Sequence, residues 1–390
     1  MTARTLYLVA GEPSGDLLGA RLMQGLRALD GELVFAGIGG EAMREQGLAS
    51  LFSQADLAVM GLAEVLPRIP RIMRRLDQTV ADIAARKPAA IVTIDSWGFN
   101  RRLIDRIRKA GIVAPRIHCV APMVWAWKAK RVHELKGRVD LLLCLFPNEP
   151  PLFEAAGVRA IHIGHPVLES GADKGDGAGF RARHGIPPDA TLVSVLPGSR
   201  RSEIARLLPP FGAALAMVAI RHPGLRAVVP TVETVAAAVE QAVRGWPVPA
   251  LAVRGSRERY DAFAASRAAL AASGTVTLEL AMAGVPMVVG YKMNPATVFF
   301  ARRLIKIEHA SLPNILAGRA VVPELLQERC EPKGLAEALG RLLEDDGARR
   351  AQKAGLDEAL ARLGRGSESP SLRAAKAILE QTVRASLRGA

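Results

Sequence analysis

The feature that most constrains this chain is an alternation of short apolar segments with longer helical stretches, which runs twice along its 390 residues. This order is typical of a parallel, doubly wound sheet, because a helix must carry the chain back between parallel strands. The length also exceeds that of one ordinary core, so we expect two α/β domains of similar size. The predicted strands are Leu6–Ala10, Val34–Gly37, Ala90–Ile94, Arg116–Val120, Leu141–Cys144 and Ala160–Ile163 in the first series, and Thr191–Leu196, Ala227–Pro230, Ala250–Val253, Ala268–Ala272 and Met287–Tyr291 in the second.

A boundary between the two series is predicted at a stretch of small and polar residues. Residues 170–179 read Ser-Gly-Ala-Asp-Lys-Gly-Asp-Gly-Ala-Gly, which is typical of a linker. We therefore expect the domain boundary near 165–175, with an N-terminal domain at 1–168 and a C-terminal domain at 180–365. The remaining segment, 366–390, is expected to form a last helix that returns to the first domain.

The charge of the chain narrows its possible partners. A net charge of +14 and a pI near 10.3 call for an anionic partner or surface. Aromatic residues make up only 4% of the chain, and no run of Lys and Arg carries interleaved aromatics, so nucleic acid is not expected. A membrane surface or a phosphorylated substrate explains the charge better.

Other class signals point to a cytoplasmic protein without a cofactor. There is no apolar run of about 18 residues, as a transmembrane helix requires, and the first strand follows the N-terminus too closely for a signal peptide. Cys119, Cys144 and Cys330 are widely spaced and are expected to be reduced core thiols. The histidines lack metal-ligand spacing, so neither a metal site nor a cofactor is predicted.

Two strand-to-helix junctions in the first series carry polar groups suited to a sugar or a phosphate. Glu12, Ser14, Gly15 and Asp16 form a Gly/Ser loop after the first strand, where backbone N–H groups and the positive end of a helix dipole are available. Glu12 and Asp16 could accept hydrogen bonds from sugar hydroxyls, or complement the dipole of the following helix. Asp95 follows the strand Ala90–Ile94, a position that suits either a general base or a helix N-cap.

The second series has two comparable junctions. Gly198, Ser199 and Arg200 end one strand in a turn, and the guanidinium could hold a pyrophosphate or simply lie in solvent. Ser273-Gly274-Thr275 opens a helix whose first N–H groups suit a phosphate. Glu279, one turn further on, could accept the hydroxyls of a ribose or be an ordinary helix residue.

A basic, amphipathic segment spans residues 59–76. Its apolar positions have helical spacing, with arginines between them, which suits the interface of an anionic membrane. The alternative is a helix that packs on the core, although Pro67 and Pro70 argue against one continuous core helix. The apolar positions are Leu62, Val65, Leu66, Ile69, Ile72, Met73 and Leu76.

Nine motifs, in this order, make the chain similar to the lipid-A-disaccharide synthases, the inverting glycosyltransferases of lipopolysaccharide assembly. Each alone has low specificity, but together they span nearly the whole sequence. They are Ala-Gly-Glu-Pro-Ser-Gly-Asp, Val-Met-Gly, Ile-Asp-Ser, Val-Trp-Ala-Trp, Ile-Gly-His-Pro, Leu-Pro-Gly-Ser-Arg, Ala-Ser-Gly-Thr, Val-Gly-Tyr-Lys-Met and Ser-Leu-Pro-Asn-Ile-Leu-Ala-Gly.

The resemblance implies a GT-B fold, in which two Rossmann-like domains face each other across a cleft and the C-terminal one holds most of the nucleotide. It implies UDP-2,3-diacylglucosamine as donor and 2,3-diacylglucosamine 1-phosphate (lipid X) as acceptor, joined by a β-1,6 linkage without a metal ion. Asp95 matches the family's essential aspartate, a general base, and Arg200 matches its essential arginine. Thr275, Glu279 and Asn314 match positions around UDP.

The resemblance also bears on location. Residues 62–76 match an apolar patch on the acceptor side, so we expect contact with the cytoplasmic face of the inner membrane of a Gram-negative cell; a homodimer is possible. One departure is Trp97-Gly98-Phe99-Asn100, where many members read Pro-Asp-Phe-Asn, so a second carboxylate is missing.

Two alternatives remain open at this stage. The first is another GT-B enzyme that uses UDP-GlcNAc, either a 2-epimerase or a peptidoglycan-type transferase. The second is a basic, non-enzymatic protein bound to a membrane or to nucleic acid, which would leave Asp95 and the two Gly/Ser loops without a purpose.

Overall fold

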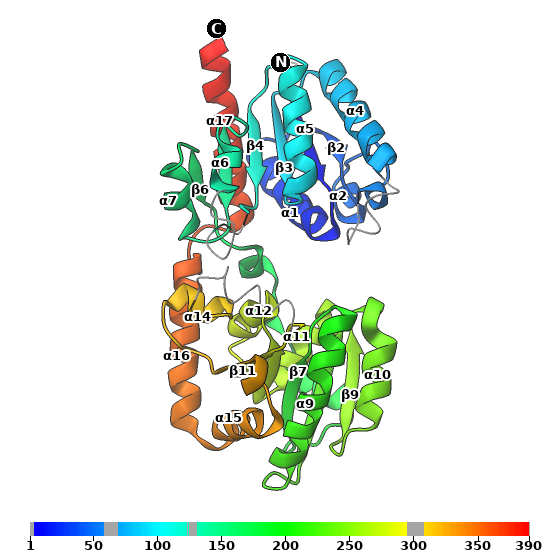
Figure 1. Ribbon diagram of the computed structural model, residues 1–390, viewed down its shortest axis with the longest axis vertical. Coiled ribbons are helices and arrows are strands. Elements are labelled where there is room, and N and C mark those ends of the chain that lie inside the picture. The colour runs from blue at the N-terminus through cyan, green and yellow to red at the C-terminus, as the bar shows by residue number, and fades with distance from the viewer. Residues whose placement is uncertain (1–3, 58–68, 123, 125–130, 295–307, 390) are drawn as a thin grey trace. The chain divides into compact units, whose positions relative to one another are not determined.

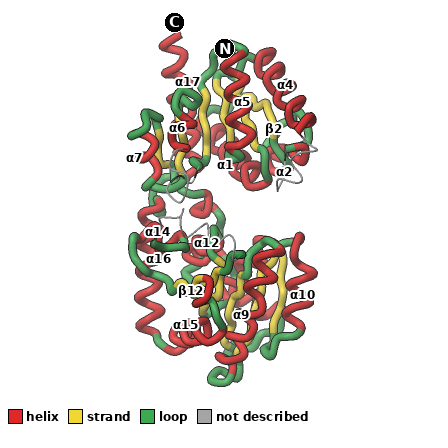
Figure 2. The backbone as a smooth tube through the Cα atoms, viewed as in Figure 1, coloured by secondary structure: helices red, strands yellow, loops and turns green. Residues whose placement is uncertain are grey.

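The computed structural model describes residues 4–57, 69–122, 124, 131–294 and 308–389. The chain forms two compact units: unit 1 is Met1–Pro166 with Ser367–Ala390, and unit 2 is Val167–Gly366. Each unit contains a six-stranded parallel sheet, with helices on both of its faces (Figures 1 and 2). The prediction of two doubly wound α/β sheets is therefore confirmed.

The sheet of unit 1 has the order β2-β1-β3-β4-β5-β6. Its strands are β1 (Thr5–Ala10), β2 (Val34–Ile38), β3 (Ala90–Ile94), β4 (Arg116–Cys119), β5 (Leu141–Cys144) and β6 (Ala160–His162). The helices are α1 (Pro13–Leu29), α2 (Glu41–Glu45), α4 (Ile69–Arg86), α5 (Trp97–Lys109), α6 (Val132–Leu135), α7 (Glu149–Glu154) and α17 (Pro370–Gly389), and η1 (Gln54–Asp56) is a short 3₁₀ turn.

Side chains along the strands of unit 1 point alternately to the two faces of the sheet, and those on each face form the core. Tyr7 and Val9 point to one face of β1, where they join a buried cluster with Leu76 of α4 and Leu103 of α5. On the other side α1 packs against α17 (Figure 1). Gly25 permits this close approach, because a Cβ atom there would lie 2.8 Å from the carbonyl oxygen of Ser371. The last helix thus belongs to the first unit.

Unit 2 has the sheet order β12-β11-β10-β7-β8-β9. Its strands are β7 (Thr191–Leu196), β8 (Leu225–Thr231), β9 (Ala250–Arg254), β10 (Ala268–Ala272), β11 (Met287–Tyr291) and β12 (Glu324–Leu326). The helices are α8 (Gly177–Arg183), α9 (Arg201–Ala219), α10 (Ala236–Arg244), α11 (Ser256–Ala265), α12 (Val276–Met282), α14 (Leu312–Ala317), α15 (Pro332–Glu344) and α16 (Asp346–Leu363), with 3₁₀ turns η4 (Pro166–Glu169), η5 (Ala172–Lys174), η6 (Glu233–Val235) and η7 (Gln327–Arg329).

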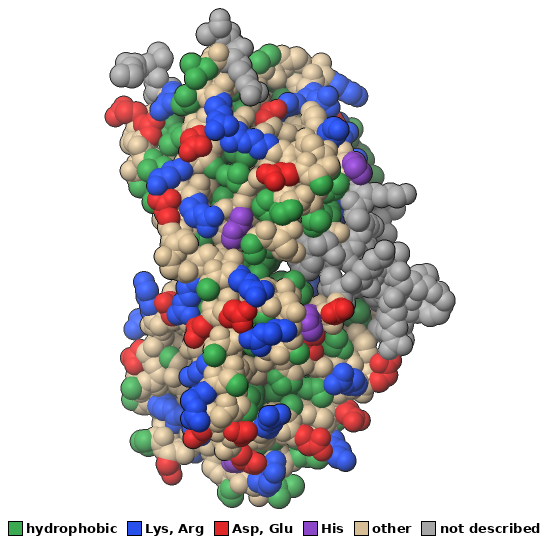
Figure 3. All heavy atoms as spheres, turned by 90° about the vertical axis from the view of Figure 1, so that its left-hand side faces the viewer, with side chains coloured by type: hydrophobic (Ala, Val, Ile, Leu, Met, Phe, Trp, Pro, Cys, Tyr) green, Lys and Arg blue, Asp and Glu red, His purple; other side chains and the backbone are tan. Residues whose placement is uncertain are grey.

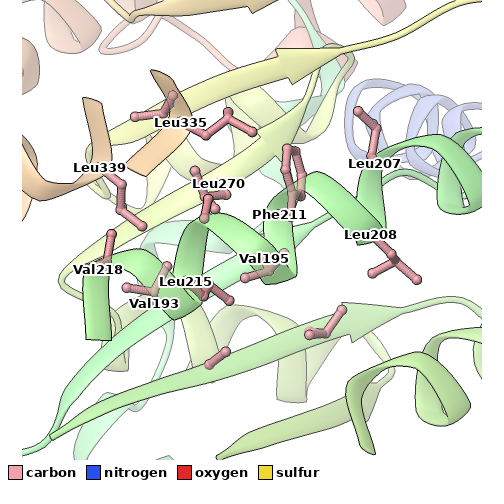
Figure 4. Packing of buried hydrophobic residues seen from close by; sticks show 14 of the residues in the cluster. Val193, Val195, Leu207, Leu208, Phe211, Leu215, Val218, Leu270, Leu335 and Leu339 are labelled. Atoms are coloured by element: carbon pink, nitrogen blue, oxygen red, sulfur yellow. The ribbon is translucent and has the colours of Figure 1, made fainter. Parts of the chain in front are cut away.

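The core of unit 2 lies between the sheet and two long helices. Phe211 and Leu215 of α9 are fully buried beside Val195 and Leu270 of the sheet, and Leu339 of α15 closes the same cluster (Figure 4). Full burial of one such side chain contributes about 1.5–3 kcal/mol. This core holds the strand ends of the unit in fixed positions.

The structure differs from the predicted chain organisation at two places. Residues 170–179 are not a free linker: α8 begins at Gly177, where Asp176 caps it, and the Asp176 N–H donates to Asp261 of α11 at 2.7 Å. The edge strand β12 was missed, because its three residues, Glu324–Leu326, are too few to give a strand pattern. Their pairing with β11 comes from tertiary contact, not from local sequence.

Candidate active site

The predicted site residues follow the strands at which each sheet reverses its direction of winding. In unit 1 the chain moves outward from β1 to β2 and then crosses to β3 on the other side of β1; in unit 2 it moves from β7 through β8 to β9 and then crosses to β10. Open α/β sheets bind ligands beyond the carboxyl ends of the strands at such a reversal. The loop at 11–16 and Asp95 flank the first reversal, and the loops at 197–200 and 273–275 flank the second.

Asp95 is held in an unusual backbone conformation at the end of β3. Its φ is +52° and that of Ser96 is +42°, a left-handed region that costs energy for non-glycine residues. The Asp95 N–H donates to Cys119 O at 2.9 Å, and the Asn100 side-chain amide donates to Asp95 O at 2.7 Å. These bonds fix the direction of the carboxylate. Its Oδ1 accepts from the Ser96 N–H at 2.8 Å, and Ser14 Oγ lies 3.5 Å from Oδ2.

Ser96 joins this carboxylate to the first loop. Its hydroxyl donates to Glu12 Oε1 at 2.8 Å, and its side chain lies so near Gly11 that a Cβ atom there would be 3.1 Å from Ser96 Oγ. The structure thus brings Glu12, Ser14 and Asp95 together, with Gly15 buried against the end of β3. Sequence reasoning did not single out Ser96, because a serine after an aspartate is common at helix starts.

The expected acceptor contact of Asp16 needs correction. Only 5% of Asp16 is exposed, and its carboxylate accepts hydrogen bonds from the N–H groups of Gly40, Ala42 and Met43 at 2.7, 2.9 and 3.1 Å. These are the first N–H groups of α2, which have no partner inside the helix. The Asp16 carboxylate therefore stabilises the start of α2 and does not face a ligand.

In unit 2 the turn after β7 already holds a carboxylate. Gly198 has a φ of +106°, and the N–H groups of Ser199 and Arg200 both point at Glu203 Oε2, at 3.1 and 3.2 Å. The Arg200 guanidinium lies 3.2 Å from Glu203 Oε1, while 68% of the Arg200 side chain is exposed. The turn is thus an anion-binding arrangement in which Glu203 occupies the N–H donors. The spacing of a capping box, with Glu three residues after the cap, is the signal that could have found Glu203.

The junction after β10 combines open donors with a partly buried carboxylate. The N–H groups of Gly274 and Thr275 donate to no protein atom in the described ranges, whereas the Ser273 hydroxyl donates to Ala310 O at 2.7 Å. Glu279 lies 3.1 Å from the Arg259 guanidinium and accepts from Tyr260 Oη at 3.3 Å. Burial raises the pKa of Glu279, and Arg259 and Tyr260 oppose that shift.

A comparison with known proteins decides the family. A family model described as lipid-A-disaccharide synthetase matches residues 6–378. The lipid-A-disaccharide synthases of Paramagnetospirillum magneticum and Rhodospirillum centenum are 57% and 54% identical to the chain. Each alignment covers 96% of this chain, with 97% and 94% of the respective relatives. The chain belongs to the lipid-A-disaccharide synthase family.

Solved structures give the fold of this synthase-family chain. UDP-GlcNAc 2-epimerase from Neisseria meningitidis, bound to UDP-GlcNAc, superimposes with a TM-score of 0.63 at 12% identity and covers 98% of this chain and all of that one. MurG from Acinetobacter baumannii gives 0.57 at 13% identity, over 98% and 99% of the two chains. These likenesses concern the fold alone. The family membership makes the chain a glycosyltransferase.

Asn314 is a second correction to the sites expected from the synthase family. Its side chain is buried, and Oδ1 accepts from the N–H groups of Val321 and Val322 at 2.7 and 2.8 Å. Its amide donates to Val322 O at 3.0 Å and to Glu324 Oε1 at 2.8 Å. Because these contacts use both ends of the amide, Asn314 holds the segment before β12 in place and its side chain has no free group for a nucleotide.

The amphipathic segment expected to meet the membrane is only partly described. Leu62, Val65 and Leu66 lie outside the described residues. In α4, Ile69 and Met73 are 43% and 41% exposed.

Two of the residues predicted to contact the membrane lie on the inner side of α4, so the prediction was wrong for them. Leu76 is fully buried and Ile72 packs against the same core, so neither is available to a membrane. Arg71 and Arg75 both pair with Asp56, which is largely buried. The exposed face of α4 is therefore narrower and less basic than the sequence indicated.

Two titratable groups near the sheet of unit 1, His118 and Cys119, are buried in its core. His118 is fully buried beside Thr93, and burial lowers its pKa to about 3; the same cause raises the pKa of Cys119 to about 12. Within the described ranges, no group of His, Cys, Asp or Glu is arranged to hold a metal ion. None of the helices in those ranges is long and apolar enough to cross a membrane.

Proposed function

We propose that this synthase-family glycosyltransferase joins UDP-2,3-diacylglucosamine to 2,3-diacylglucosamine 1-phosphate, giving a β-1,6-linked disaccharide 1-phosphate and UDP with inversion at the anomeric carbon. The observation that carries the proposal is the carboxylate of Asp95, fixed at the strand reversal of unit 1 in a chain of this family. Inversion in a single displacement needs a base that removes the acceptor proton on the face opposite the leaving group.

Asp95 is the base in this proposal. Its Oδ1 is already engaged by the Ser96 N–H, whereas Oδ2 has, among the described residues, only the long contact with Ser14 Oγ. In this proposal Oδ2 therefore takes the proton from the acceptor's 6-hydroxyl. The new C1–O6 bond forms as the bond from C1 to the UDP oxygen breaks. Positioned general bases contribute about 10²–10⁴-fold to rate. In the proposal, Glu12, which accepts a hydrogen bond from Ser96, and Ser14 bind other hydroxyls of the acceptor sugar.

Unit 2 supplies the contacts to the leaving group. The Arg200 guanidinium balances the charge that grows on the departing pyrophosphate, together with the N–H groups of Ser199 and Arg200. Because Glu203 now accepts from those N–H groups, the pyrophosphate has to displace its carboxylate. Gly198 gives this turn its conformation.

The nucleoside part of UDP is assigned to the junction after β10. The open N–H groups of Gly274 and Thr275 suit a phosphate oxygen, and Ser273 shapes the loop through its bond to Ala310. Glu279 accepts the ribose hydroxyls, and its contact with Arg259 favours the charged form that this role needs. No metal ion takes part, since Arg200 and the N–H donors neutralise the phosphates.

Both substrates carry acyl chains, which supports action at the cytoplasmic face of an anionic inner membrane. The exposed side of α4, with Ile69 and Met73, is the described part of the contact surface. Side chains of this kind partition into the headgroup boundary, where basic residues add attraction to anionic lipids.

The test is release of UDP from UDP-2,3-diacylglucosamine in detergent, with and without lipid X, in the presence of a chelator. Release that depends on lipid X and yields a β-linked disaccharide phosphate is the expected result, and the anomeric proton coupling in the product reports inversion. An α-linked product would contradict the single displacement. Turnover of UDP-GlcNAc alone, with no reaction of the acylated sugars, would point to a 2-epimerase instead.

A further inference from the structure

The amino-terminal edge of the unit 1 sheet carries a pocket. This edge is at the opposite ends of the strands from Asp95. The pocket has a volume of about 930 Å³ and is lined by residues at the starts of β3, β4, β5 and β6, the loop 111–115 and the last turns of α17. The pocket residue Ala89 lies six residues before Asp95 in the sequence. At a rise of about 3.3 Å per residue, the pocket is about 20 Å from Asp95 along the strand. It is therefore separate from the proposed acceptor site.

The lining of this pocket is strongly basic. It contains the side chains of Arg108, Arg116, Arg159 and Arg384, and Asp140 is its one acidic residue. Over the face drawn in Figure 3, basic and acidic side chains are interspersed. Gathering like charges around one hollow is unfavourable unless an anion enters it.

The acidic residue of the pocket, Asp140, pairs with Arg116. Its carboxylate accepts from the Arg116 N–H at 2.8 Å and from Nε and Nη2 of the same residue at 3.0 and 2.9 Å. Arg159 donates to the neutral Gln381 Oε1 at 2.6 Å, a contact that ties β6 to α17. Arg108 and Arg384 form no ion pair within the ranges that the structure describes. Among the described residues, the positive charges of Arg108 and Arg384 therefore have no carboxylate partner in the pocket.

The remaining wall of the pocket is apolar. It is formed partly by the loop that follows α5, where Ile112 and Val113 lie, and Val113 is 99% exposed. An exposed valine beside arginines suits a ligand that has both an anionic group and an organic part. The pocket volume falls within the range of about 300–1,000 Å³ that small-molecule sites occupy.

We propose that this pocket binds a phosphate-bearing anion, with the phosphate held by Arg108 and Arg384 and the organic part against the loop at 111–115. Guanidinium groups match phosphate because their planar N–H donors form paired, charge-assisted hydrogen bonds. The same chemistry occurs in a soluble phosphate ester and in the headgroup of an anionic phospholipid. Neither ligand belongs to the proposed transfer reaction at Asp95.

Two probes that both carry a glycerol phosphate group, one as a soluble monoester and one as a lipid diester, distinguish these sources. Glycerol 1-phosphate is titrated by calorimetry, and vesicles of phosphatidylcholine with and without phosphatidylglycerol are tested by co-sedimentation, both with the full chain. The pocket variant is Arg108→Gln with Arg384→Gln. The matched control, Arg244→Gln with Arg350→Gln, removes the same total charge from exposed positions in unit 2.

Loss of two charge-assisted contacts predicts binding at least about tenfold weaker in the pocket variant, and unchanged binding in the control. A difference with glycerol 1-phosphate supports a soluble ester as ligand, and a difference confined to phosphatidylglycerol vesicles supports a lipid. Equal binding of both probes by the two variants, or no binding by the unaltered chain, overturns the proposal. If the double variant unfolds early, Arg384→Gln compared with Arg384→Lys gives the same test with one charge.

Discussion

Replacement of Asp16 by alanine tests whether its carboxylate supports the fold or a substrate. The change removes three hydrogen bonds from backbone N–H groups, at 2.7, 2.9 and 3.1 Å, to a carboxylate that is 5% exposed. A hydrogen bond to a charged group contributes about 1.5–3 kcal/mol. Three such bonds would sum to about 4.5–9 kcal/mol. Because the short helix α2 can move and expose some of its N–H groups to water, we expect a loss below that range, about 3–4 kcal/mol of unfolding free energy.

A conservative variant removes only part of these hydrogen bonds, so its loss of stability should be smaller. Asp16→Asn keeps an oxygen for the N–H groups of Gly40 and Met43, but places an NH₂ group against the N–H of Ala42. The expected cost is about half that of the alanine variant, roughly 1.5–2 kcal/mol. Asp77→Asn is the matched control, since this carboxylate is exposed and its one ion pair within the described ranges is with Arg106, so about 0.5 kcal/mol or less is expected.

The assay is denaturant unfolding, combined with hydrogen exchange of peptides that cover α1, β2 and α2. We expect faster exchange around Gly40 in the order Asp16→Ala, Asp16→Asn, unaltered chain, with KM for the acceptor sugar changed little. An alanine variant of full stability with a strongly raised acceptor KM would refute this reasoning and return Asp16 to the substrate site.

Four further predictions follow from the same geometry. Asp95→Asn should lower turnover at least about 10²-fold and leave UDP affinity unchanged, because asparagine tolerates the left-handed backbone but cannot take the proton. A parallel loss of UDP binding, measured by calorimetry, would mean that Asp95 has a structural role. Arg200→Ala should weaken UDP binding and lower the rate together, so unchanged affinity would remove Arg200 from the pyrophosphate site. Leu76→Ala should lower the free energy of unfolding by about 2–5 kcal/mol and leave vesicle binding unchanged. Met73→Ser should weaken vesicle binding and leave the stability unchanged. Loss of vesicle binding in a fully stable Leu76 variant would contradict the burial of Leu76. Burial puts the folded-state pKa of His118 at about 3, below its ordinary value of 6.5, so the unfolded chain binds more protons than the folded chain between those pH values. The stability contributed by neutral His118 is therefore full above pH 6.5 and falls by about 1.4 kcal/mol per pH unit on acidification. His118→Gln should abolish this component when unfolding is measured as a function of pH.

The positions of Asp95, Arg200 and the two Gly/Ser loops were predictable because they depend on local order along the chain. Each follows an apolar strand, and the carboxyl end of a parallel strand is where such folds expose polar loops. Which loops become neighbours was not predictable in this way. The meeting of Asp95 with Ser14 depends on β3 pairing with β1, across 81 residues of chain.

The fold class and the family thus lie in the sequence alone, since strand and helix periodicity and the ordered motifs are properties of consecutive residues. The roles of Asp16, Asn314 and Leu76 were decided by tertiary structure. Each looked available to a ligand or a membrane in the sequence, yet Asp16 meets α2, Asn314 meets the segment before β12, and Leu76 enters the core. Burial and hydrogen bonding depend on partners that only folding brings close, so a polar or apolar residue in a motif does not by itself reveal whether its side chain is free.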